Sequence, residues 1–192
     1  LIFTDGDCIP HPAFVAEHLK NKEPDICLAG RRVDLSGNIT RLLTPENIKK
    51  GILQSTGMKC RMFSEYLRMR LFHVMNGVYF KNKLLRKFSN RKERGLLGAN
   101  FSLHKVDMMA INGFDERYTT ATYGEDSDVE LRLRLHGIRL RTVLNIAVQY
   151  HCYHKPLPRP EASRLQYETA LAEQRAFTPY GIIKEQENTR PE

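Results

Sequence analysis

Short apolar runs alternate with helix-like spacings along this chain of 192 residues. The first run, at residues 1–4, is β-branched and aromatic and stops at Asp-Gly-Asp. It therefore predicts a buried strand that carries Asp5 and Asp7 into the loop at its end. Because these two acids lie two positions apart, their side chains leave an extended backbone on one face and can converge on one divalent cation and its phosphates. The alternative is a solvated Asp-Gly turn.

Downstream, the pattern predicts helices and strands in alternation, which indicates an α/β chain. Helices are predicted over residues 12–20, about 45–53, 63–74, 106–111 and 161–175, with a second basic helical piece around 80–88. Strands are predicted over 25–33 and 96–104, one or two more over 139–150, and a turn at 34–38. A stiff Pro-rich exit follows at 156–160, and the polar tail from about Lys184 is expected to be loose.

Residues 125–136 give conflicting signals. The apolar positions alternate with charged ones at Val129, Leu131, Leu133 and Leu135, and this period of two favours a strand. Three acids crowd the start of the segment, however, and His136-Gly137 closes it, as is typical of a helix. We predict a helix.

The formal net charge is +8 and the sequence pI is about 9.4, and the positive charge is concentrated in one stretch. Between Lys49 and Arg94 there are thirteen Lys or Arg residues against two acids, a surplus of eleven. Phe and Leu residues recur there at three- and four-residue spacings, which predicts amphipathic helices over about 57–94. Such a surface is either an ordinary solvated face or one that binds anionic lipid headgroups. No recognised nucleic-acid motif accompanies the charge, so we expect no nucleic-acid partner.

Two further features bear on location. The sequence has no window of eighteen apolar residues and no signal-peptide pattern. Its four cysteines, Cys8, Cys27, Cys60 and Cys152, lack metal-ligand spacing, which favours reduced thiols. We therefore expect a single cytoplasmic domain, with peripheral contact to the inner face of the membrane through residues 57–94.

Several motifs follow one another in a specific order. After the Asp-x-Asp segment come Gly-Ala-Asn-Phe-Ser-Leu at 98–103, Ile-Asn-Gly-Phe-Asp-Glu at 111–116, Tyr-Gly-Glu-Asp-Ser-Asp-Val-Glu at 123–130, and a strand that ends at His151. In this order, over about 150 residues, they resemble the second half of the catalytic domain of glycosyltransferase family 2, the GT-A type. The most similar subgroup is the one related to galactosyltransferases and chondroitin polymerases.

The resemblance implies a partial GT-A, nucleotide-diphospho-sugar transferase-like α/β fold, with a mixed sheet flanked by helices. Residues 1–155 would be the C-terminal, metal- and acceptor-binding part of the catalytic domain, with a basic helical insertion at about 57–94. Residues 156–192 would form the Pro-rich exit, a helix and the tail. The nucleotide-binding half is expected to precede Leu1, and its absence would leave one sheet edge exposed.

The resemblance also implies roles for individual residues. Asp7 would bind the metal and the donor, while Asp5 would face the ribose or reach the metal through water. His151 would complete the metal site, with His154 close enough to compete, and a His-Asp ligand set suits Mn²⁺ better than Mg²⁺. Asp126 would be the catalytic base. The acceptor would contact Asn100, Tyr123, Gly124 and Glu125.

The expected function is that of an inverting, metal-dependent glycosyltransferase. It would move a sugar from a nucleotide-sugar donor, UDP-linked, to a hydroxyl of a glycan or glycolipid in cell-envelope polysaccharide synthesis. The chain departs from the family pattern in two ways. Thr122-Tyr123 stands where relatives often have Trp, so the acceptor platform differs or is Tyr-based, and the missing Gln-x-x-Arg-Trp signature favours a single addition over polymerisation. The alternative is a non-catalytic carbohydrate- or membrane-binding fragment of such an enzyme.

Overall fold

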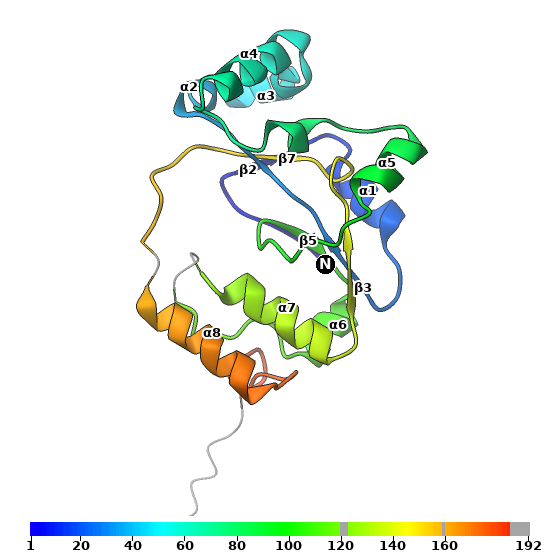
Figure 1. The fold of residues 1–192 in the computed structure, drawn as a ribbon, viewed down its shortest axis with the longest axis vertical. Helices are drawn as coiled ribbons and strands as arrows, with labels where there is room; N and C mark the ends of the chain where they lie inside the picture. Colours follow the sequence, from blue (N-terminus) through cyan, green and yellow to red (C-terminus); the bar gives the residue numbers. More distant parts are fainter. Residues whose placement is uncertain (120–122, 159, 185–192) are drawn as a thin grey trace, which may run out of the picture.

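A computed structural model describes residues 1–119, 123–158 and 160–184. Within these residues the chain has an α/β fold in which two small sheets are flanked by helices (Figure 1). The architecture agrees with the predicted mixed-sheet fold and is consistent with part of a nucleotide-sugar transferase-like domain. The predicted division of the chain near residue 155 stays a prediction.

The first sheet has four strands in the order β1-β5-β3-β6. These strands are β1 (Ile2–Thr4), β5 (Asn100–Ser102), β3 (Ile26–Ala29) and β6 (Arg139–Thr142). β3 and β6 are parallel, and the other two pairs are antiparallel. All four residues of β3 are buried, as is Phe101, so the core of the sheet lies at its centre.

The prediction that the first strand is buried is wrong. β1 lies at the edge of the sheet, with β5 as its one neighbour among the described residues. Its side chains are only partly covered, and Thr4 is exposed. Phe3 still anchors the strand, because its ring stacks on Phe101 with a centroid separation of 4.3 Å.

The second sheet has three strands in the order β2-β7-β4. They are β2 (Cys8–Pro10), β7 (Gln149–His151) and β4 (Val33–Asp34). The register pairs His151 with Cys8 on one side and with Asp34 on the other. Three segments that are far apart in the sequence therefore meet around the end of β7.

The strand predicted over 25–33 divides into β3 and β4 at Gly30. The Gly30 N–H donates to the Asn100 carbonyl at 2.8 Å, and a Cβ at Gly30 would lie 2.1 Å from Asn100 Oδ1. Only glycine permits this approach, and here the chain leaves the first sheet for the second.

Helices flank the sheets. The predicted helices correspond to α1 (Phe14–Asn21), α6 (Lys105–Ala110), α7 (Glu125–Leu135) and α8 (Glu161–Glu173). The helix prediction for 125–136 is confirmed, since α7 buries Asp128, Val129, Arg132 and Leu133, a helical pattern in which two of the four members are charged. α8 packs against α7 (Figure 1).

The segment of the chain between β4 and β5 is mostly helical. It contains α2 (Gly37–Thr40), α3 (Pro45–Lys49), η1 (Ile52–Gln54), α4 (Thr56–Leu67), η2 (Val74–Gly77) and α5 (Lys83–Ser89). The predicted turn at 34–38 is wrong at its C-terminal end, because Ser36 caps α2 by accepting the Ile39 N–H. Thr44 caps α3 as expected.

The helix predicted over 63–74 is displaced. α4 begins at Thr56 and ends at Leu67, and it buries Met58, Met62 and Glu65. The predicted apolar face at Phe63 and Leu67 points to solvent instead. All four cysteines are free, as predicted. None of the helices in the described part of the chain has the length and apolarity needed to cross a bilayer.

Candidate active site

A cleft of about 750 Å³ opens where the two sheets meet the N-terminus of α7. Asp5 and Asp7 reach it from the loop between β1 and β2, and Asp126 reaches it from α7. The two acids that follow the first strand therefore share one cleft with Asp126. The remaining lining includes the predicted residues Tyr123, Gly124, Glu125, His151 and His154.

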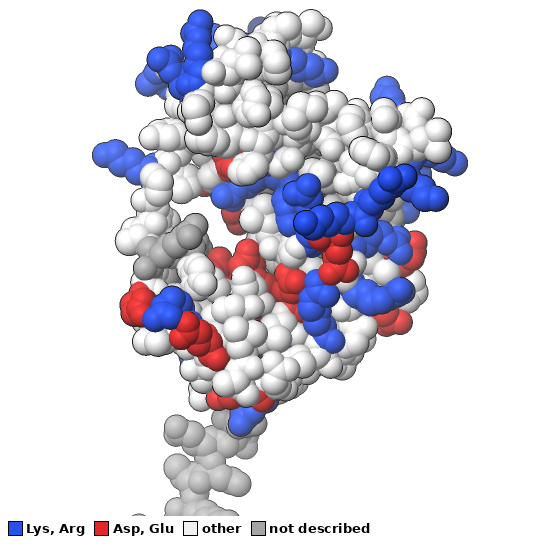
Figure 2. Space-filling view, in the orientation of Figure 1, with Lys and Arg blue, Asp and Glu red and all other residues white. Residues whose placement is uncertain are grey.

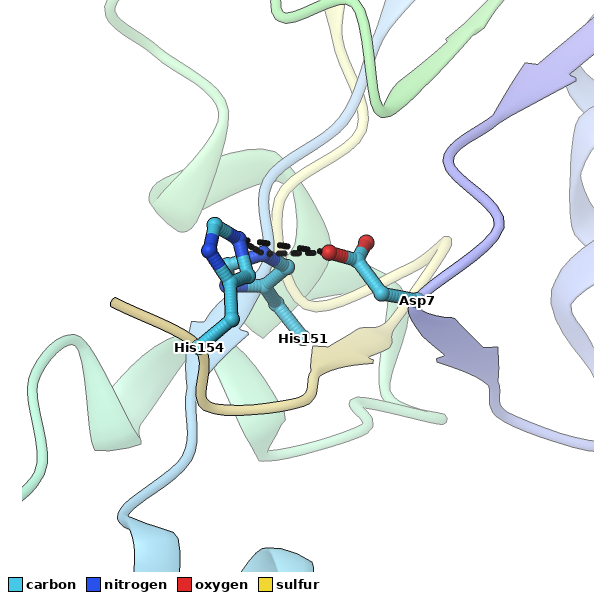
Figure 3. A group of neighbouring side chains, drawn as sticks. All are labelled: Asp7, His151 and His154. Atoms are coloured by element: carbon cyan, nitrogen blue, oxygen red, sulfur yellow. Dashed lines mark hydrogen bonds and ion pairs between the residues drawn. The ribbon is translucent and has the colours of Figure 1, made fainter. Parts of the chain in front are cut away.

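Asp7, His151 and His154 converge on one point of this cleft (Figure 3). Asp7 Oδ2 lies 3.2 Å from His151 Nε2 and 3.3 Å from His154 Nε2, and the two Nε2 atoms are 3.2 Å apart. The β2–β7 register brings Asp7 to His151, and the Cys152 N–H, donating to the Asp7 carbonyl at 2.9 Å, fixes the loop. The structure thus places both candidate histidines at the site, where the sequence left His151 and His154 as alternatives.

The Nδ1 atom of each histidine ring contacts a neighbouring oxygen, and this contact orients the Nε2 atom towards Asp7. His154 Nδ1 donates to the Lys155 carbonyl at 2.8 Å, and His151 Nδ1 lies 3.2 Å from Asp34 Oδ1. Each contact places a proton on Nδ1, so the Nε2 atom of each ring is the one that faces the Asp7 carboxylate. A divalent cation at this point would be within reach of all three ligand atoms, Asp7 Oδ2 and the two Nε2 atoms.

The chemistry of this group fits a metal in a second respect. Asp7 Oδ1 is buried and has no hydrogen-bond partner among the described residues. A buried carboxylate oxygen without a donor is costly, and a cation satisfies it. Cys8, which lies next to the acidic pair, is a poor ligand because burial raises the pKa of its thiol to about 12 and keeps it protonated.

Sequence reasoning missed a second layer of this site, formed by Arg32, Asp34 and His73. Arg32 bridges Asp34 and Asp5, with N···O separations of 3.2 Å to each. His73 Nδ1 lies 2.8 Å from Asp34 Oδ2. Arg32 also lines the cleft, where its guanidinium is one of the few positive groups among acids. The signal in the sequence is the Arg31-Arg32-Val33-Asp34 run that directly follows a buried strand.

Asp126 is oriented by backbone donors. Its Oδ2 accepts the Gly98 N–H at 3.2 Å, and its Oδ1 accepts the Ser127 N–H at 2.7 Å. Gly124, at φ +96°, turns the chain into α7 just ahead of it. Oδ1 also accepts the Ser127 hydroxyl at 3.4 Å, so Oδ2 is the oxygen that keeps a further lone pair for a hydroxyl that enters the cleft.

Glu125 has a different environment from its neighbour. Burial raises the pKa of Glu125, and the nearby carboxylates Asp126 and Asp5 raise it further. Its Oε2 is buried without a partner in the described residues. Burial is also the main cause of a raised pKa at Asp5, where the Arg32 guanidinium acts in the opposite direction. The cleft therefore holds more negative charge than its own cations neutralise.

The structure does not bring Asn100 to the cleft, which corrects the prediction that it contacts the acceptor. Asn100 is fully buried, and its amide donates to the Arg31 and Ala147 carbonyls at 2.9 Å each. Its Oδ1 lies 3.1 Å from His18 Nε2. With all these positions engaged, Asn100 joins the two sheets behind the cleft. Thr122, which was named with Tyr123 as a departure from the family pattern, lies outside the described residues.

Residues 83–155 match the family model described as the N-terminal domain of galactosyltransferase. The match covers less than half of the chain and supports a glycosyltransferase domain. It includes Asp126 with the start of α7, as well as His151 and His154, whereas Asp5 and Asp7 precede it. The curated proteins contain no match to this chain.

The similarity to the galactosyltransferase domain and the cleft agree in location. Within the matched segment, the residues that line the cleft are the Leu97–Ala99 turn, the α7 N-terminus and the end of β7. The segment therefore contributes much of the wall of one cleft, and glycosyltransferase activity in general is the function that it supports.

Proposed function

We propose that this chain forms the metal- and acceptor-binding part of an inverting glycosyltransferase. The donor is a nucleotide sugar, UDP-linked, and the acceptor is a hydroxyl of a glycan or glycolipid. The observation that carries the proposal is the shared cleft of about 750 Å³, which Asp7, His151 and His154 line together with the oriented carboxylate of Asp126.

The chemistry needs a base on one side of the sugar and charge stabilisation on the other. Asp126 takes the proton of the acceptor hydroxyl as that oxygen forms its bond to the sugar carbon. The bond from the same carbon to the diphosphate breaks, and the diphosphate leaves with the electron pair. Attack from the face opposite the leaving group inverts the configuration.

Residues at the other wall hold the donor. Asp7, His151 and His154 would hold the cation, and Mn²⁺ suits their mixture of oxygen and nitrogen better than Mg²⁺. When bound, the cation supplies charge neutralisation for the departing diphosphate. Arg32 contributes a fixed positive charge beside it, while Glu125 and Tyr123 line the side at which the acceptor enters.

Calorimetry with UDP tests donor binding. We expect UDP to bind in the presence of Mn²⁺ and to lose at least about tenfold in affinity when Mn²⁺ is chelated or when Asp7→Asn removes a ligand charge. Mn²⁺ binding without any affinity for UDP would favour the alternative of a non-catalytic fragment.

Asp126→Asn tests the base. Asn keeps one oxygen for either the Gly98 or the Ser127 N–H, loses the other acceptor and cannot take a proton, so UDP affinity should persist while sugar transfer falls by about 10²–10⁴-fold. Transfer from a radiolabelled UDP-sugar to a carbohydrate acceptor measures this. Unchanged transfer in the variant would exclude Asp126 as the base.

A further inference from the structure

Large apolar side chains project from the α4–η2 region of the surface. Phe63, Leu67, Met69, Phe72 and Met75 are each more than half exposed, and Met69 reaches 77 %. Monomeric proteins seldom expose so many large apolar groups within one short segment unless something covers them. The end of the molecule formed by α2–α4 is mostly uncharged or basic in the space-filling view (Figure 2).

The charges around these side chains have one sign. Lys59, Arg68, Arg70 and Lys81 are exposed, and none of them makes an ion pair within the described part of the chain. The one acid between residues 59 and 81 is Glu65, which is buried and faces Arg61 at 3.8 Å. The surface therefore offers apolar groups and unneutralised cations together.

Helical spacing places the two kinds of side chain on the same face of α4. Lys59, Phe63 and Leu67 recur every four residues, on a different side of the helix from the buried Met58 and Met62. Beside them opens a largely apolar cavity of about 490 Å³ that Met62, Phe63, Val74 and Met75 line, with the exposed Lys59 and Lys81 among its walls. Such a cavity can take part of an acyl chain whose anionic headgroup meets the lysines.

We propose that residues 59–81 form a surface that binds an anionic lipid bilayer. Basic side chains meet the headgroups, and the exposed Phe, Leu and Met side chains enter the boundary between headgroups and acyl chains. The charge is the argument for this occupant, because an apolar protein partner would not require four free cations around the patch.

The position of this surface bears on the candidate active site. Phe72 exchanges backbone hydrogen bonds with Asp34, and His73 contacts the Asp34 carboxylate, which lies next to His151. A bilayer against residues 59–81 would therefore lie close to the cleft. If the proposed function holds, the acceptor is then a lipid whose hydroxyl lies near the membrane surface.

Vesicle sedimentation with the intact chain tests the proposal. We expect binding to vesicles of phosphatidylcholine plus phosphatidylglycerol that is at least about tenfold stronger than binding to phosphatidylcholine alone and that weakens with added salt. Replacing Phe63, Leu67 and Met69 together by Ser should reduce that binding by about tenfold or more, as should Lys59→Glu with Arg68→Glu and Arg70→Glu. The matched control replaces Leu165 and Leu171, which are exposed on α8, and should bind as the parent does.

Parental vesicle binding by the triple serine variant would overturn the proposal. So would salt-sensitive binding to RNA without binding to the anionic vesicles. UDP calorimetry on the same variant shows whether its cleft is intact and keeps the two hypotheses separate. Vesicle binding without UDP binding would contradict only the proposed function, and UDP binding without vesicle binding would contradict only the lipid surface.

Discussion

At the residue scale, Glu125 and Asp126 are neighbours with opposite surroundings. Backbone N–H groups solvate both oxygens of Asp126, whereas Glu125 Oε2 is buried without a partner among the described residues. Burial and the carboxylates of Asp126 and Asp5 raise the pKa of Glu125 above its ordinary value of 4.5. The surroundings of Glu125 thus disfavour its charged form, and perturbed ionisable groups of this kind are common at functional sites.

We expect Glu125→Gln to stabilise the protein by about 1 kcal/mol at pH 7, because burial and the neighbouring carboxylates disfavour the Glu125 charge more than its backbone hydrogen bond favours it. When folding raises the pKa of a carboxyl group, the folded protein binds more protons than the unfolded chain at any pH between the unfolded-state and folded-state pKa values. The stability of the parent therefore falls as the pH rises above about 4.5. The stabilisation by Glu125→Gln should shrink towards zero below that pH, because Glu125 is then protonated in both the folded and the unfolded chain.

Chemical denaturation of both proteins from pH 4 to pH 8 measures this difference. Glu23→Gln is the control of opposite sign, since the Arg141 guanidinium lowers the pKa of Glu23 and its removal should give no stabilisation at pH 7. A loss of stability in Glu125→Gln at pH 7 would show that this side chain has a partner when ionised.

At the element scale, α7 depends on a buried ion pair. Arg132 contacts Asp128 at 2.7 Å, both side chains are 3 % exposed, and Arg132 also donates to the Ile111 and Gly113 carbonyls. The pair fastens α7 to the Asn112-Gly113 turn. It also explains why the apolar residues of this helix alternate as they would in a strand, since two charged residues occupy buried positions that apolar residues usually fill.

We expect Asp128→Ala to destabilise the protein by about 3–5 kcal/mol, because it leaves the Arg132 charge buried without a counter-ion. Urea unfolding gives the change in the free energy of unfolding. Glu161→Ala is the matched control, since it breaks a helical ion pair with Arg164 on exposed α8 and should leave the unfolding midpoint unchanged. Equal effects of the two substitutions would contradict the role assigned to the buried pair.

Gly124 sets the start of α7 and hence the position of Asp126. Its φ is +96°, and a Cβ there would lie 2.9 Å from Tyr118 Cε1 and 3.3 Å from the Ser163 carbonyl. We expect Gly124→Ala to cost more than about 1–2 kcal/mol and to reduce sugar transfer. Gly137→Ala isolates the backbone contribution, because Gly137 has φ +91° but nothing within 4 Å, and it should cost less and leave transfer intact.

Helices that begin with a clear capping or charge signal could be predicted from the sequence. The side of each helix that packs into the core could not. The caps at Thr44 and the acids of α7 gave correct helix starts. The spacing of Phe63 and Leu67 identified an amphipathic helix, but it did not identify Met58 and Met62 as the side chains of that helix that enter the core. Periodicity shows that side chains share a face, but the neighbour of that face depends on packing between segments far apart in the chain.

At the scale of the whole molecule, the candidate site joins five separate segments. They are the β1–β2 loop, the residues around Arg32, the 97–99 turn, the α7 N-terminus and the end of β7. The motif order predicted that Asp7, Asp126 and His151 share one site. It could not predict Arg32 and Asp34, which the β4–β7 register brings to His151, nor His73, which follows the bridge between Asp34 and Phe72. It also could not predict the burial of Asn100.

Because its ligands come from two segments, the proposed cation site should couple metal binding to the stability of the whole chain. Asp7 lies on the loop before β2, and His151 and His154 lie at and beyond the end of β7. A cation that binds only the folded chain at a hundred times its Kd adds about 2.7 kcal/mol to the free energy of unfolding. For a chain of this size, that corresponds to a rise in Tm of about 5–10 °C.

Thermal unfolding with and without Mn²⁺ measures this rise. Asp7→Ala should abolish it, and His154→Ala should reduce it, since both side chains reach the same point at the cleft. His136→Ala, on the exposed end of α7 and away from the cleft lining, should keep the full Mn²⁺ effect. If His154→Ala retained the parental rise while His151→Ala lost it, the cation would rest on Asp7 and His151 alone, and the convergence of both Nε2 atoms would have another cause.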